Sequence, residues 1–312
     1  MKFTKGHGTR NDFVLVDDRD DTLDLTADLV RLLADRRSGV GGDGVIRLAP
    51  TAALAASGDP AAQAALRDNP EARWFMDYRN ADGSIAEMCG NGVRVFAAYA
   101  ESLGLADLST PGASLPVATR AGVKNVSRDG DWYVVDMGAW FFPAGDNAAA
   151  SGADATVQAA GWDAARPALS VNLGNPHTVV RVDSAADLAA LDLSRQPAVT
   201  PTPPQGSNVE FIDFLDQPDD ADGTDGHANG RADGHLRMRV FERGVGETPS
   251  CGTGCCAAAL AARHWRLNTD GTAPDTYLVE IPGGTVRVRA LASGHVELAG
   301  PAVLTYTGSI EI

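Results

Sequence analysis

One four-residue pattern, Cys-Gly-[Asn/Thr]-Gly, occurs twice in this chain and limits its possible folds more than any other feature. The two copies occupy residues 89–92 and 251–254. Each copy comes directly before an apolar stretch with helical spacing, which predicts helices over 90–103 and 252–265. Such a repeat indicates two similar halves, each with a cysteine at the start of its main helix.

A cysteine at the start of a helix is chemically favoured as a thiolate. The first backbone N–H groups of a helix have no partner within it, and the helix dipole leaves a partial positive charge there. We therefore expect the pKa of Cys89 and of Cys251 to lie below the value of about 8.5 of a free thiol. The glycines that follow lack a Cβ, so a substrate carboxylate can approach the same N–H groups.

Two such cysteines on opposite faces of one carbon atom can invert it. One thiolate removes the Cα proton, while the other sulfur, as a thiol, delivers a proton to the opposite face. A buried structural cysteine is the common alternative for a single copy, but two matched copies favour catalysis. Cys255 and Cys256 fall inside the second helix and are expected to be small core residues.

The composition argues against several other classes of protein. The 312 residues suffice for two domains of roughly 150 each, and the net charge of -15 argues against a nucleic-acid partner, which needs a basic surface. No apolar run is long enough for a membrane span, and the N-terminus lacks the apolar segment of a secretory signal, so we expect a cytoplasmic protein. The cysteine spacing matches no zinc site, and we expect neither metal nor cofactor.

One glycine-rich motif is rejected as a nucleotide site. Residues 39–44 fit Gly-x-Gly-x-x-Gly, but the dinucleotide fingerprint needs a strand before it and a helix after it. Here a helix is expected over 25–36 and a strand over 45–48, the reverse order.

Periodicity predicts an alternation of strands and helices. Residues 50–71 are predicted to be a helical insertion or a loose loop, 143–154 a linker, and the aspartates between 216 and 233 a solvated loop. The strand starting at Asn208 is interpreted as an echo of the one starting at Asn11. Beyond 45–48, strands are predicted over 11–16, 72–78, 132–137, 178–182, 208–214, 236–241, 277–281, 285–290, 295–298 and 303–307.

Polar residues gather at the ends of these predicted elements, where a substrate site would need them. Asn175 and His177 lie in one turn, and Glu242-Arg243 ends a strand shortly before Cys251. Arg243 could hold a carboxylate with two parallel hydrogen bonds. Each cluster alone is more often a plain turn or a surface charge.

Together these segments make the chain resemble the diaminopimelate epimerase family along nearly its whole length. The resemblance implies a cofactor-independent isomerase that interconverts LL- and meso-diaminopimelate in lysine and peptidoglycan-precursor biosynthesis, as a homodimer. It implies an α/β fold of two similar domains, each a curved mixed sheet wrapped around a central helix, with the site in the cleft between them. The domains would be 1–136 with a strand at about 302–312, and 137–301. The resembling stretches are 5–13, 37–44, 80–94, 174–177, 208–211, 242–254 and 300–310.

The resemblance also assigns roles to residues. Cys89 and Cys251 would be catalytic, His177 and Glu242 would tune the cysteine pKa values, and Tyr306 would lie in a dimer contact. The substrate-binding residues would be Asn11, Asn80, Gly90, Asn91, Asn175, Asn208, Glu242, Arg243, Gly252 and Thr253. The chain departs from the family pattern at Gly44, where some members have a substrate-contacting Gln, and at Gly6 and Arg10.

Two alternatives stay open. A proline or hydroxyproline racemase would use a similar pair of cysteines on a smaller substrate. Asn91, the strand segment 208–211 and Glu242-Arg243 favour diaminopimelate instead, because a long substrate needs polar contacts at its far end. A non-catalytic amino-acid-binding protein of the same fold would need neither thiol.

Overall fold

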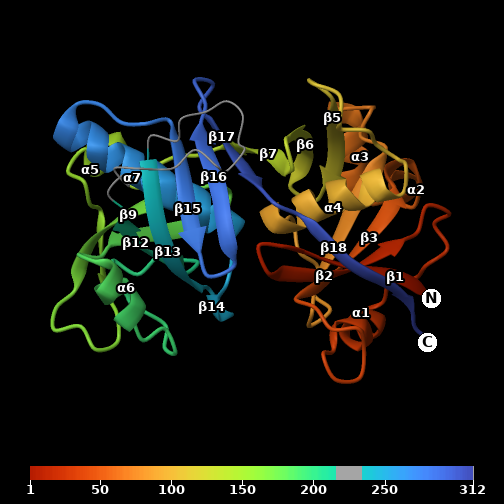
Figure 1. Ribbon diagram of the computed structural model, residues 1–312, viewed down its shortest axis with the longest axis horizontal. Helices are drawn as coiled ribbons and strands as arrows, with labels where there is room; N and C mark the ends of the chain where they lie inside the picture. The colour runs from red at the N-terminus through yellow and green to blue at the C-terminus, as the bar shows by residue number, and fades with distance from the viewer. Residues whose placement is uncertain (216–233, 312) are drawn as a thin grey trace. The chain divides into compact units, whose positions relative to one another are not determined.

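The strands and helices of this protein group into two units, shown in Figure 1 as a computed structural model that describes residues 1–215 and 234–311. The N-terminal unit comprises residues 1–136 and 299–312, and the C-terminal unit comprises 137–298. The sequence analysis divided the chain at similar residues; that each part is an independent domain stays a prediction. The acidic segment predicted to be a solvated loop lies outside the described residues.

A mixed sheet forms most of the N-terminal unit, and helix α4 (Gly90–Ser102) packs against it. The strands pair in the order β18-β1-β2-β3-β4-β5-β6-β7. They are β1 (Lys2–Gly8), β2 (Asn11–Asp17), β3 (Gly44–Pro50), β4 (Trp74–Asn80), β5 (Ser114–Thr119), β6 (Gly122–Asp129), β7 (Trp132–Ala139) and β18 (Val303–Ser309).

The C-terminal unit is built in the same way around helix α7 (Gly252–Asp270), which packs against β9, β10, β12, β13, β15 and β16. None of the helices in the described ranges is long and apolar enough to cross a membrane. The strands are β8 (Ala155–Gln158), β9 (Arg166–Asn172), β10 (Pro176–Arg181), β11 (Ala198–Thr200), β12 (Asn208–Phe214), β13 (Gly234–Glu242), β14 (Gly246–Thr248), β15 (Thr276–Ile281), β16 (Gly284–Ala290) and β17 (His295–Gly300).

Helix α4 is buried on all sides over most of its length, and α7 over most of its N-terminal half. Every residue of α4 from Gly90 to Ala100 is buried, and α7 is buried from Gly254 to Ala262. Small and apolar residues all round a helix are typical of one enclosed by a sheet, not of a surface helix with one apolar face. The predicted starts of both helices are confirmed.

The two units repeat one strand pattern. Strands β1 to β6 pair antiparallel, parallel, antiparallel, parallel and antiparallel in turn, and β9, β10, β12, β13, β15 and β16 do the same. Helix α1 (Ala27–Ala34) connects β2 to β3, as α6 (Ala185–Ala190) connects β10 to β12. The proposed echo between Asn11 and Asn208 is therefore wrong. The counterpart of β2 is β10, so Asn175, immediately before β10, corresponds to Asn11.

The segments 50–71 and 143–154, for which the sequence predicted an insertion or loop and a linker, both contain helices. Residues 50–71 hold α2 (Thr51–Ala56) and α3 (Pro60–Asp68), the latter capped by Asp59, whose side chain accepts from two backbone N–H groups. The predicted linker at 143–154 is wrong, because this segment holds α5 (Asp146–Ala149) and lies inside the C-terminal unit. The chain leaves the N-terminal unit within β7 instead.

Candidate active site

In the N-terminal unit, Cys89 is the residue that caps helix α4. Its backbone is extended, with φ -139° and ψ 119°, and the N–H of Gly92 points at Sγ from 3.4 Å. The Cys89 thiol in turn donates a hydrogen bond to Asn11 Oδ1 at 3.4 Å. Asn91 Nδ2 donates to the same oxygen at 3.3 Å. The unit thus brings Asn11, Cys89 and Asn91 together.

The amide of Asn11 is oriented by a residue that the sequence analysis did not identify. Asn11 Nδ2 donates to Asp43 Oδ2 at 2.7 Å, and Arg36 donates to Asp43 Oδ1 at 2.8 Å. Since the carboxylate accepts only, the amide oxygen of Asn11 must face Cys89. The loop that carries Asp43 was considered as a rejected nucleotide motif and as a stretch that resembles the family, without a role for Asp43. Its position directly before β3 brings Asp43 to the start of β2.

A buried arginine supports Asn91. Arg94 is fully buried in α4, and its Nη2 donates to Asn91 Oδ1 at 2.9 Å and to Thr9 Oγ1 at 3.3 Å. Arg94 was not predicted as a site residue. A charged residue within a helix of small and apolar residues was the available signal, because buried charges require specific partners.

Asn80 ends β4, opposite Gly44 of β3, and its Nδ2 donates to Ser84 Oγ at 3.0 Å. The backbone explains why position 44 departs from the family pattern. A Cβ on Gly44 would lie 2.4 Å from Arg79 O and 2.6 Å from Tyr78 Cε2. No side chain fits there without moving β4.

In the C-terminal unit, Cys251 is the residue that caps helix α7. Its Sγ lies 3.6 Å from Thr253 Oγ1, which also accepts a hydrogen bond from Asn175 Nδ2 at 3.2 Å. Cys255 and Cys256 are fully buried within α7, as the sequence predicted.

Asn208, Glu242 and Arg243 lie around the ends of β12 and β13. The backbone N–H of Arg243 donates to Asn208 Oδ1 at 2.9 Å, and Asn208 Nδ2 donates to Pro176 O at 3.3 Å. Glu242 accepts from the Thr248 hydroxyl, and the Arg243 guanidinium donates to a backbone carbonyl of its own unit.

His177 has a carboxylate partner that the sequence analysis missed. Its Nδ1 lies 2.7 Å from Glu210 Oε1, and both side chains are fully buried. The signal was a glutamate next to Val209, Phe211 and Ile212 in the centre of a strand that is buried on both faces, where an acid needs a partner.

The electrostatic environment of Cys251 differs from the expectation. Burial raises the pKa of the Cys251 thiol well above its usual value, and the carboxylates of Glu242 and Glu210 raise it further. Hydrogen bonds from Thr253 and from the Gly254 N–H act in the opposite direction. The expected lowering is wrong for Cys251, because burial and two carboxylates outweigh the helix terminus.

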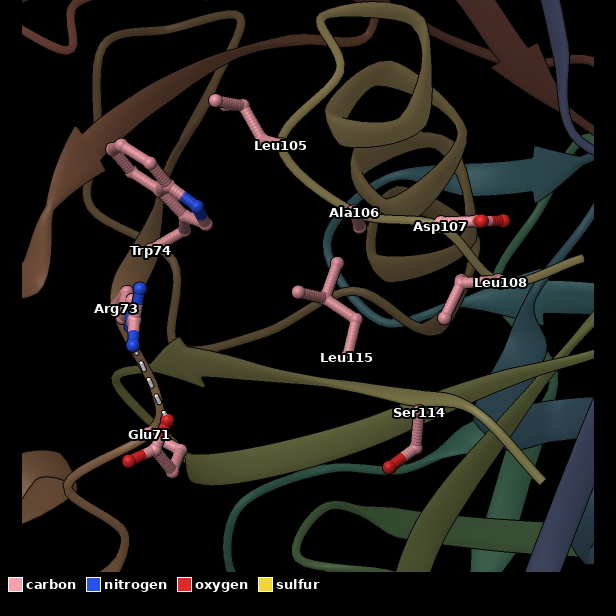
Figure 2. Close-up of a pocket in the computed structure, with 9 residues that line it drawn as sticks. All are labelled: Glu71, Arg73, Trp74, Leu105, Ala106, Asp107, Leu108, Ser114 and Leu115. Atoms are coloured by element: carbon pink, nitrogen blue, oxygen red, sulfur yellow. Dashed lines mark ion pairs between the residues drawn. The ribbon is translucent and has the colours of Figure 1, made fainter. Parts of the chain in front are cut away.

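Other features lie away from the two cysteines. Among the described residues, no three His, Cys, Asp or Glu side chains are arranged to hold a metal ion. A pocket of about 200 Å³ in the N-terminal unit is lined by Trp74, Leu105 and Leu115, among others (Figure 2). It lies by the segment that follows α4, whereas Cys89 precedes this helix, whose 13 residues span about 20 Å. The pocket is therefore separate from the surroundings of Cys89.

Comparisons with known sequences point to one family along nearly the whole chain. A family model described as diaminopimelate epimerase matches residues 3–142 and 169–305. A diaminopimelate epimerase from Streptomyces coelicolor is 45% identical over 318 residues, covering 100% of this chain and 96% of that protein. One from Corynebacterium glutamicum is 39% identical over 320 residues, covering 100% of this chain and 99% of its own length.

Solved structures share the fold at low sequence identity. A Bacillus anthracis protein of the phenazine biosynthesis PhzF family has a TM-score of 0.59 at 15% identity, covering 100% of this chain and 99% of its own. A hydroxyproline epimerase from Agrobacterium vitis has a TM-score of 0.58 at 16% identity, covering 99% of this chain and 91% of its own. These likenesses confirm the predicted mixed α/β fold.

Proposed function

The chain belongs to the diaminopimelate epimerase family, and from that premise we propose that it interconverts LL- and meso-diaminopimelate without metal or organic cofactor. The observation that supports this most strongly is the repeated half-site, a cysteine followed by Gly-x-Gly at the start of each buried central helix. Two sulfurs acting on opposite faces of Cα provide the two proton transfers that epimerisation requires.

The remaining site residues are proposed to hold the substrate. Backbone N–H groups at Gly90-Asn91 and Gly252-Thr253 suit the α-carboxylate, because the first turn of a helix offers unpaired donors. The amides of Asn11, Asn80, Asn175 and Asn208, with Glu242 and Arg243, supply polar contacts for the rest of the molecule. His177 and Glu242 tune the cysteines.

Incubating the purified protein with LL-diaminopimelate in deuterated water tests the proposal. We expect deuterium at Cα of the product, with EDTA having no effect. Cys89→Ala and Cys251→Ala should each lose at least about 10²-fold in rate, the usual contribution of one acid–base group. Cys255→Ala, in the same helix as Cys251 but fully buried, is the control and should retain activity. Wild-type turnover in Cys89→Ala, or inactivation by EDTA, would exclude this mechanism.

The same assay separates the alternatives. A proline or hydroxyproline racemase would exchange the Cα proton of proline but not that of diaminopimelate, and a binding protein would exchange neither. The relatives at 39–45% identity that bear the diaminopimelate name favour the longer substrate.

We also propose that the protein is a homodimer and that it works in the cytoplasm. On β18, Val303 is 43% exposed and Tyr306 48% exposed, and Tyr306 stacks edge-on against Phe3 at 6.1 Å. We propose that a second copy of the chain binds the exposed side of β18. Tyr306→Asp should halve the mass measured by sedimentation, and an unchanged mass would place the interface elsewhere. The cytoplasm suits an enzyme whose cysteines are all free, since thiols stay reduced there.

A further inference from the structure

A line of hydrogen bonds crosses the N-terminal unit from a buried guanidinium to a carboxylate, through two amides. Arg94 Nη2 donates to Asn91 Oδ1 at 2.9 Å, and Asn91 Nδ2 donates to Asn11 Oδ1 at 3.3 Å. Asn11 Nδ2 then donates to Asp43 Oδ2 at 2.7 Å. Each of these bonds therefore has its donor on the Arg94 side and its acceptor on the Asp43 side.

The two ends of this line cannot exchange roles. A guanidinium only donates hydrogen bonds and a carboxylate only accepts them, whereas an amide does either, depending on which way it is turned. Turning the amide of Asn11 over would place two N–H groups against each other at Asn91 and two oxygens against each other at Asp43. Because a buried polar group without a partner is costly, the line holds both amides in one orientation.

Asp43 is held in place by three donors. Arg36 Nη2 donates to Oδ1 at 2.8 Å, and Oδ2 accepts from the backbone N–H of Asp12 at 3.1 Å as well as from Asn11. The backbone N–H of Asp43 donates in return to Asp12 O at 2.8 Å. The acceptor at this end of the line is therefore fixed beside the start of β2, the strand that carries Asn11.

Within the described residues of the C-terminal unit, the equivalent positions hold no such line. By strand register and by distance from the cysteine, the counterparts of Asn11, Asn91, Arg94 and Asp43 are, in that order, Asn175, Thr253, Cys256 and Ser207. Asn175 Nδ2 donates to the Thr253 hydroxyl at 3.2 Å, and the Ser207 hydroxyl donates to Asn208 O. A hydroxyl both donates and accepts, so charge fixes the amide orientation in the N-terminal unit and not here.

The fixed orientation decides what Asn11 offers to a ligand. Its Nδ2 carries two hydrogens, and within the described ranges one of them has an acceptor, Asp43. Since the Asn11 side chain is partly exposed, the second N–H can meet a substrate. An ammonium group has no acceptor, so the groups of diaminopimelate that can receive this N–H are its two carboxylates. An amide turned the other way would offer an oxygen, which suits an ammonium group instead.

We propose that Asp43 and Arg94 are positioning residues that orient the amides of Asn11 and Asn91, so that Asn11 presents an N–H to a carboxylate of the substrate. This inference rests on the epimerase function proposed above. Each of the two charged residues acts on the substrate through an amide. Without them, Asn11 would face the substrate with its oxygen in part of the molecules. The carboxylate would bind only the remaining fraction, and the affinity would fall by that fraction.

Asp43→Asn tests the proposal in the kinetics, because it keeps the shape of the side chain but allows it to donate as well as accept. We expect the KM for LL-diaminopimelate to rise about tenfold, which corresponds to a competent fraction of roughly one-tenth. The kcat should change less than about threefold, since the amide already has the correct orientation once substrate is bound. A general loss of structure would lower kcat without this selective rise in KM. An unchanged KM would overturn the proposal.

Asp17→Asn is the matched control. Asp17 lies at the other end of β2 and pairs with Arg19 at 2.7 Å, so this variant also removes an ion-paired carboxylate from the strand. Its KM should be unchanged, and a rise equal to that of Asp43→Asn would overturn the proposal. At the Arg94 end, Arg94→Lys keeps a group that only donates, whereas Arg94→Gln also accepts. The KM should rise more in Arg94→Gln, and the reverse order would exclude the role of Arg94.

NMR of the empty protein tests the orientation without substrate. Asn11 Nδ2 and the backbone N–H of Asp12 both donate to Oδ2 of Asp43, so their hydrogens lie close together. We expect a nuclear Overhauser effect between them in the unmodified protein, and a weaker one in Asp43→Asn. Its absence from the unmodified protein would overturn the proposal, even if Asp43→Asn fails to fold.

The two measurements separate this inference from the proposed function. If the Overhauser effect is present but LL-diaminopimelate is not turned over, the epimerase proposal fails and the orientation of Asn11 is supported. Turnover without the Overhauser effect overturns the orientation alone.

Discussion

Gly92 and Gly254 occupy equivalent places in the first turns of α4 and α7, yet their surroundings differ. A methyl group on Gly92 would press on the flexible end of Ile46, whereas one on Gly254 would meet a buried carboxylate at 2.8 Å. Gly254→Ala should therefore lower the free energy of unfolding by about 1–3 kcal/mol, the usual cost of overpacking. Urea unfolding measures this. Gly92→Ala is the control and should change it by less than about 1 kcal/mol, because the helix favours Ala. An equal loss of unfolding free energy in both variants would show that the Glu210 carboxylate moves aside at little cost.

Sequence patterns identify the site residues that recur or sit at element ends, and they miss those that act through a neighbour. Cys89 and Cys251 repeat within a motif, so they stand out. Asp43 and Glu210 take part in the site only because they hydrogen-bond to Asn11 and His177, respectively. The two members of each pair are remote in sequence and come together only through parallel strand pairing. No local spacing contains that information.

At the scale of elements, the turn between β1 and β2 carries strain. Thr9 and Arg10 have φ values of 49° and 65°, the left-handed region that favours glycine. The Thr9 side chain offsets part of this strain, since its hydroxyl accepts a hydrogen bond from the buried Arg94. Arg10 is exposed, so Arg10→Gly should raise the free energy of unfolding by up to about 1 kcal/mol. Thr9→Gly, which relieves the same strain but loses the hydrogen bond, should not. Urea unfolding distinguishes the two, and a gain in Thr9→Gly alone would contradict this account.

The central helices and buried strands were predictable, whereas several polar strands were not. Strand β6 alternates little and is mostly half-exposed, and β1 contains two lysines, a histidine and two glycines. Such segments are strands because neighbours pair with them on both sides. Tertiary pairing outweighs weak local preference there.

In the N-terminal unit, one buried aspartate makes the free energy of unfolding depend on acid pH. Asp77 is fully buried among Arg47, Arg79 and Arg120. Burial acts to raise the pKa of Asp77, but hydrogen bonds and charge from Arg79 and Arg120 outweigh it, and the pKa is lowered. The stabilisation is therefore present above the unfolded value of about 3.9 and is lost as the pH falls through the lower folded value.

Asp77→Asn tests this. At pH 7 it should cost about 3–5 kcal/mol, because buried guanidinium groups lose their shared carboxylate. Its stability should also fall less steeply than that of the wild type between pH 5 and the acid limit, as followed by urea unfolding at each pH. Parallel pH curves for the two proteins would show that Asp77 is not the group that titrates.

Strand β18 pairs with β1 along its whole length, and the amino group of Met1 donates a hydrogen bond to Ile310 O. Both ends of the chain therefore belong to the N-terminal unit. The C-terminal unit, by contrast, is one continuous segment. On the ribosome, β1 is made long before β18, the strand that pairs with it. Domains synthesised first usually also fold first. Here the N-terminal unit can complete its sheet only after the C-terminal unit has been synthesised. A nascent chain halted before residue 303 carries β1 with an open edge, the kind of surface that recruits other strands.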